Sequence, residues 1–200
     1  MFFQNIQSQD IWNIELDKKI IGTFHTEDTV INGFSFGIYS GVSDKRNVKT
    51  NGLRLETPGI GMISFMGNGV SSATEPFSLK NYKFSEVING LNISTGSWCE
   101  CNYNGFTIGL VGQYGKLGNG ISLAGGWNLI DKQNGIQLAF IANNSYYMNG
   151  VQISAFNNIS NGSGLQIGII NRSKKFKGIQ IGLWNINQKR SLPIMNWNFN

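Results

Sequence analysis

Residues 150–183 read GVQISAFNNISNGSGLQIGIINRSKKFKGIQIGL, a stretch in which one phrase occurs three times: glycine, apolar, polar, apolar, small, apolar. Copies of the phrase extend back toward the middle of the chain, and their first glycines are spaced by 15, 15, 15, 15, 14 and 14 residues. These glycines are Gly90, Gly105, Gly120, Gly135, Gly150, Gly164 and Gly178. A short fixed period is typical of chains built from stacked units that complete their cores only against neighbours. The spacing therefore predicts an all-β repeat protein.

Each copy alternates apolar residues with small or polar ones, which is the pattern of a β-strand with two unlike faces. The strand is followed by Asn or Gly, residues that tolerate the left-handed backbone of a corner. Because every copy begins with Gly and ends in the same way, the copies share one direction, and we predict a β-solenoid with 14–15-residue repeats. The alternative is an up-and-down antiparallel sheet or an outer-membrane β-barrel, which also places an apolar face opposite a polar one.

The organisation of the chain predicts three parts. Residues 1–31 are expected to form an N-terminal capping segment. Residues 32–89 contain the degenerate copies GFSFGI and GLRLET, with an irregular excursion at 67–85 that holds turn formers and a proline. Residues 90–200 form the regular repeat region and end in a C-terminal cap.

The composition excludes several classes of protein and of site. Only 14% of the residues are charged, and 26 glycines stand against 3 prolines, which favours turn-rich β structure over disorder or a helical bundle. His25 is the only histidine and has no nucleophile motif beside it, so we interpret it as a polar turn residue. Cys99 and Cys101 have no second pair to complete a zinc site, and we expect two reduced thiols. We therefore predict no enzyme, no cofactor and no metal.

The formal net charge is +5, and the basic residues cluster only near the end of the chain. The cluster consists of Arg172, Lys174, Lys175, Lys177, Lys189 and Arg190. Its two groups occupy the same segment of successive repeats, so we expect one basic edge and favour a solvated turn over an anion site. No aromatic residues alternate with these lysines, as binding of single-stranded nucleic acid would require. A nucleic-acid partner is therefore not expected.

Stacking of the repeats aligns like residues into columns. One polar column contains Gln137, Gln152, Gln166 and Gln180, beside a column of small residues. A flat uncharged surface of this kind suggests a docking face for another sheet, a glycan or an ordered lattice. The alternative interpretation is that the stacked amides hydrogen-bond along the solenoid and stabilise it.

The carboxyl-terminal sequence is more specific than the composition. Residues 164–197 read GLQIGIINRSKKFKGIQIGLWNINQKRSLPIMNW. This sequence resembles a family of bacterial surface-repeat proteins, frequent in Bacteroidota, whose repeats read close to GLQIGLIN and which often finish with a motif like RSLPINW. The resemblance spans about residues 90–198 and implies an exported protein of the cell envelope, with no catalytic residues to carry over. The amino terminus departs from that pattern, because it lacks the basic start and long apolar run of a secretory signal.

Together these observations predict a non-enzymatic repeat protein of the bacterial cell envelope, located in the periplasm, the outer membrane or at the surface. Its expected partner is another macromolecule, a protein or glycan of the envelope, and its expected role is an accessory or plug subunit of an outer-membrane assembly. An integral outer-membrane β-barrel is the first alternative, and membrane association is compatible with both. The second alternative is a carbohydrate-binding solenoid that uses Glu75, Phe77 and Tyr82 of the excursion.

Overall fold

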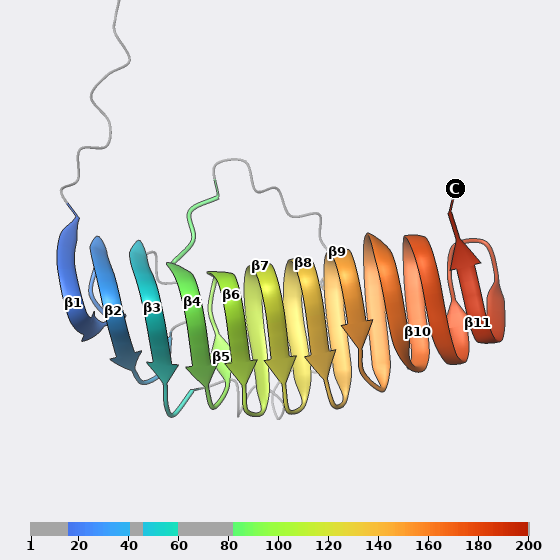
Figure 1. Ribbon diagram of the computed structural model, residues 1–200, viewed down its shortest axis with the longest axis horizontal. Helices are drawn as coiled ribbons and strands as arrows, with labels where there is room; N and C mark the ends of the chain where they lie inside the picture. The colour runs from blue at the N-terminus through green and yellow to red at the C-terminus, as the bar shows by residue number, and fades with distance from the viewer. Residues whose placement is uncertain (1–15, 41–45, 60–81, 200) are drawn as a thin grey trace, which may run out of the picture.

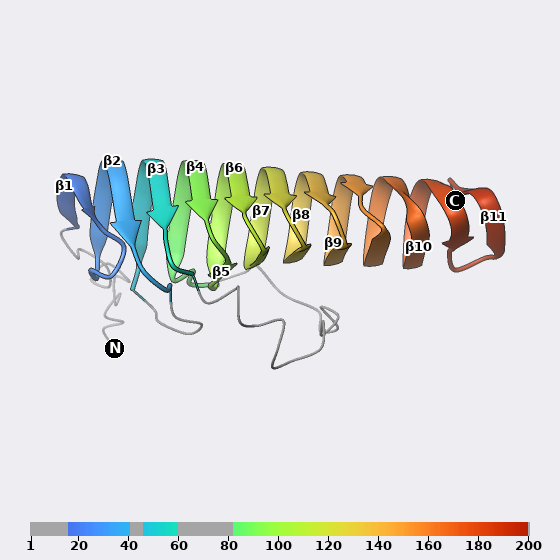
Figure 2. The same cartoon turned by 90° about the horizontal axis from the view of Figure 1, so that it is seen from below.

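The computed structural model describes residues 16–40, 46–59 and 82–199, which form a rod of stacked β-coils (Figure 1). The strands are β1 (Asp17–Thr23), β2 (Thr29–Gly37), β3 (Val48–Glu56), β4 (Glu86–Ser94), β5 (Ser97–Trp98), β6 (Cys101–Gly109), β7 (Gly112–Ala124), β8 (Trp127–Ala139), β9 (Ala142–Ile153), β10 (Phe156–Ile186) and β11 (Ser191–Asn198). The chain advances along the rod in sequence order, so each coil contacts the coil before it and the coil after it (Figure 2). Most of the predicted excursion, residues 67–81, lies outside the described residues.

Successive coils pair in parallel and in register. Gly33 of β2 lies opposite Gly52 of β3, and Gly120 of β7 lies opposite Gly135 of β8. This arrangement confirms the predicted β-solenoid. The up-and-down antiparallel alternative is wrong, because within the described residues only β11 runs antiparallel to its neighbour, the end of β10.

The first glycine of each copy belongs to a column that runs the length of the rod. Nine glycines of this column are present in the described residues, with φ between 121° and 153°. Side chains with a Cβ rarely adopt such angles. A Cβ on Gly120 would also meet the carbonyl oxygen of Gly105 in the preceding coil. Glycine is therefore required at this position for two reasons, the backbone angle and the close approach of successive coils.

In the regular coils, the half that begins at the glycine column has a polar interior, whereas the half that precedes it buries apolar residues such as Met148, Ile159 and Phe176. Gln152 donates from Nε2 to Oε1 of Gln137 at 2.7 Å, Gln166 donates to Gln152 at 3.0 Å, and Gln180 donates to Gln166 at 2.7 Å. All four side chains are fully buried. The prediction of an outward docking face at these glutamines is therefore wrong. The alternative interpretation is the one that agrees with the structure, since the stacked amides hydrogen-bond to one another along the solenoid.

A second buried ladder lies at the predicted corners. Asn143 donates from Nδ2 to Oδ1 of Asn157 at 3.1 Å and to the backbone oxygen of Ile153 at 3.0 Å. The same pair of contacts recurs for Asn128, Asn157 and Asn171. Each asparagine thus joins its own corner to the next coil, at residues on either side of that coil's corner.

The two cysteines form a disulfide, so the expectation of reduced thiols is wrong. Cys99 lies at a bend between β5 and β6, and its Cα is 5.1 Å from that of Cys101. Two residues of extended strand would separate these atoms by about 6.6 Å. The pair is fully buried and packs with Ile88 and Tyr103 in one of the apolar clusters of the N-terminal half of the rod.

Because the glutamines are buried, a charged residue in their place is expected to destabilise the fold. We expect Gln152→Lys to lower the free energy of unfolding by about 3 kcal/mol or more, because it buries an unpaired ammonium group and breaks two hydrogen bonds. Urea denaturation followed by circular dichroism measures this loss. The matched control is Asn161→Lys, in an outward column whose earlier member Lys132 is already a lysine. An unchanged denaturation midpoint for Gln152→Lys would contradict the buried ladder.

Candidate functional site

Two columns of apolar side chains point outward along one side of the rod, and we call them the apolar face. They flank the buried column that contains Gln137 and Gln152, since successive residues of a strand point to opposite faces of the sheet. The first column contains Phe34, Leu53, Leu91, Phe106, Ile121, Ile136, Val151, Leu165 and Ile179. The second column contains Phe36, Leu55, Ile93, Ile108, Leu123, Leu138, Ile153, Ile167 and Ile181.

None of these side chains is buried by the rest of the chain. Phe106 is 53% exposed, Ile153 39% and Ile181 39%, although each has neighbours of the same kind in the coils on either side. The columns therefore form a continuous apolar surface, and the side chains buried directly behind it are polar. The sequence pattern identified the two unlike faces of each strand correctly. The prediction placed the polar face outside, and it therefore missed this apolar surface.

The margins of the apolar face are uncharged over most of its length. On one margin, exposed or half-buried asparagines hydrogen-bond from coil to coil over 2.7–3.3 Å. They are Asn32, Asn51, Asn89, Asn104, Asn119, Asn134 and Asn149. On the other margin, Leu110, Phe140 and Leu183 are 67%, 84% and 73% exposed and extend the apolar surface round the corner of the coil.

A groove of about 420 Å³ lies at this corner near the C-terminal end of the rod. Phe156, Ile170 and Trp184, from three successive coils, form one row of its lining, and Asn158 and Arg172 belong to the other row. The groove thus combines an aromatic and aliphatic wall with one cationic side chain.

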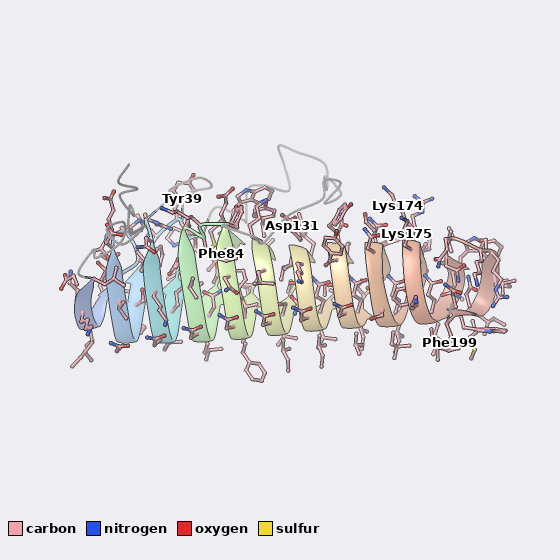
Figure 3. All side chains as sticks on the ribbon, turned by 90° about the horizontal axis from the view of Figure 1, so that it is seen from above. Tyr39, Phe84, Asp131, Lys174, Lys175 and Phe199 are labelled. Atoms are coloured by element: carbon pink, nitrogen blue, oxygen red, sulfur yellow. A yellow bond between two sulfur atoms is a disulfide. The ribbon has the colours of Figure 1, made fainter. Side chains whose placement is uncertain are left out.

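The predicted basic residues are all exposed, and the structure places them at three different positions. Arg172, Lys174 and Lys175 lie on the half of the coil that precedes the glycine column, where Figure 3 shows both lysines projecting from the same long side of the rod as Asp131. Lys177 directly precedes Gly178, at the asparagine margin. Lys189 and Arg190 lie in the turn before β11, where the guanidinium of Arg190 lies 4.5 Å from the ring centre of Trp197.

A charged cluster is buried at the N-terminal end of the rod. Arg54 Nε lies 2.8 Å from Glu86 Oε1, and its Nη1 lies 3.0 Å from Glu56 Oε2, with all three side chains fully buried. Burial opposes the charge on Arg54, but the attraction of Glu86 and Glu56 outweighs it and raises the pKa of the guanidinium. Burial likewise acts to raise the pKa of Glu56, whereas Arg54 and the hydrogen bonds from Ser40 lower it below its usual value. The carboxylate of Glu56 is thus held ionised inside the rod.

The other expected chemical residues do not converge on a catalytic arrangement in the described part of the chain. His25 lies in the turn between β1 and β2, where Thr23 accepts a hydrogen bond from its backbone nitrogen. Glu75 and Phe77 lie outside the described residues, and Tyr82 packs edge-on against Phe84. Among residues 16–40, 46–59 and 82–199, no three His, Cys, Asp or Glu side chains are grouped so as to hold a metal ion.

Comparison of this chain with family models, with curated proteins and with solved structures finds no match. The described residues include no helix that has the length and apolarity needed to span a membrane.

Proposed function

We propose that this chain is a non-enzymatic repeat protein of the bacterial cell envelope that binds another macromolecule through its apolar face. The observation that carries the proposal is the strand half of the coil that begins at the glycine column, where amides lie inside and two columns of aliphatic and aromatic residues lie outside. Monomeric soluble proteins rarely expose contiguous apolar patches larger than a few hundred Å². A surface that extends over every described coil from β2 to the end of β10 is thus best explained as a binding surface.

The envelope location is proposed from the resemblance of residues 164–197 to bacterial surface-repeat proteins. An accessory or plug subunit of an outer-membrane assembly agrees with this location and with a rigid rod that offers one long uncharged side. A non-enzymatic role is supported by the positions of the carboxylates: Glu56 and Glu86 are buried against Arg54, and Asp131 is paired with Lys116 at 2.8 Å.

Photo-crosslinking in cells of the source organism tests the proposal. A benzophenone amino acid replaces Leu138 on the apolar face, and in a matched control it replaces Tyr147 on the half of the coil that precedes the glycine column. We expect light-dependent adducts with a macromolecule in the envelope fraction from position 138, and few or none from position 147. Equal labelling at both positions, or no adduct at position 138, would contradict a binding role for the apolar face.

A further inference from the structure

The side chains of the apolar face are regularly spaced, and this spacing restricts which partner surfaces can pack closely against it. Its rows follow the parallel register of the coils, so like side chains recur every 4.8 Å or so along the rod, and within a strand they recur at every second residue, about 6.6 Å. Side chains of a partner can enter the spaces between these rows along the whole face only if they repeat with the same spacing. Another β-sheet has that spacing, and facing sheets with identical side chains interdigitate in this way.

The size of the face is sufficient for a stable dimer. With its margins, the face extends over nine rows of the described coils, so that it is about 40 Å long and about 20 Å wide, roughly 800 Å² in area. Stable interfaces commonly bury about 800 Å² on each partner. One copy can therefore cover the apolar face of another without any additional contact surface.

The charge distribution is compatible with contact between identical faces. The chain carries a formal net charge of +5, but neither apolar column contains a charged residue. Lys116, Lys132, Lys174 and Lys175 lie on the half of the coil that precedes the glycine column, away from the face. Pairing of two apolar faces therefore leaves most of the like charges on the outside of the dimer.

We infer that the partner of the apolar face is a second copy of this chain, and that the two rods pack face to face through a two-fold, isologous interface. The inference rests on the proposed function and names its partner. The columns of one copy fill the spaces between the rows of the other, and the asparagine margins form the polar rim of the interface.

Light scattering coupled to size-exclusion chromatography tests the inference with the full chain in detergent-free buffer. We expect a mass of twice 22.1 kDa at micromolar concentration. The double variant Leu123→Lys and Leu138→Lys is expected to raise the dimer dissociation constant at least about a hundredfold, because each interface then contains four unpaired ammonium groups. The matched control, Tyr147→Lys with Asn161→Lys, places the same charges on the other half of the coil and is expected to remain dimeric.

Crosslinking of the purified chain keeps the test decisive if the lysine variant fails to fold. The benzophenone at position 138 is expected to give covalent dimers, and the one at position 147 is not. A monomeric wild-type chain without such dimers overturns the inference. If position 138 then still forms adducts with a different macromolecule in cells, the proposed function stands with another partner, or with a lipid surface if the adduct is a lipid. If it forms none, both fail.

Discussion

Gly135→Ala is expected to lower the free energy of unfolding by about 3 kcal/mol or more, which is a large share of the stability of an ordinary domain. Gly135 has a φ of 128°, and a Cβ at this position would meet the carbonyl oxygen of Gly120 in the coil before it. The obstacle is backbone, which cannot turn aside as a long side chain can. Relief requires separation of two coils that are hydrogen-bonded in register on both sides of the glycine. Urea denaturation followed by circular dichroism measures the effect.

Gly109→Ala is the matched control for this substitution. Gly109 has no positive φ, and it occupies the position at which the next two coils have Ala124 and Ala139. We expect its substitution to change the free energy of unfolding by less than about 1 kcal/mol. Comparable losses for the two variants would show that the glycine column is not required for its backbone geometry.

Arg54→Met is expected to destabilise the rod by about 3–5 kcal/mol, the range found when one partner of a buried ion pair is removed. The substitution leaves Glu56 buried without its cation and deprives Glu86 of a contact at 2.8 Å. It also removes the guanidinium that lies 4.0 Å from the ring centre of Phe24 and donates to Asn92 at 2.9 Å. Thermal and urea unfolding of the full chain measure the loss.

A second substitution separates the charge effect from simple loss of packing. Glu56→Gln, added to Arg54→Met, removes the uncompensated carboxylate, and Glu86 retains Arg46 at 3.9 Å. The double variant is expected to recover part of the lost stability. If it were no more stable than Arg54→Met alone, the buried charge on Glu56 would not be the cause of the loss.

The solenoid was predictable because its determinants recur in every copy. The glycine column and the asparagine corners are local requirements of backbone conformation, and a fixed period shows where they coincide. The shared direction of the copies favoured parallel over antiparallel neighbours for the same reason. The parallel register of Gly33 with Gly52 shows that these rules also hold in the degenerate copies.

The candidate site was not predictable to the same degree. Alternation distinguishes the two faces of a strand but does not show which face is inside. Stacked amides such as those of Gln152 and Gln166 can be buried because, once their register is fixed, they hydrogen-bond to each other. The ion pair of Arg54 with Glu86 joins residues 32 apart across the least regular part of the sequence, where no period indicates the partner. The disulfide depends on a local bend at Cys99 that a strand pattern does not show.

The reversed direction of β11 has a consequence for the length that the rod can reach. In a parallel stack, the last coil has unpaired backbone groups at the edge where every earlier coil pairs with its successor. Another chain with the same repeat could pair with that edge and continue the stack indefinitely. Here that edge is occupied by an antiparallel strand that contains Pro193, a residue without a backbone donor. This strand therefore opposes continuation of the parallel stack by a second chain in the same register at that edge.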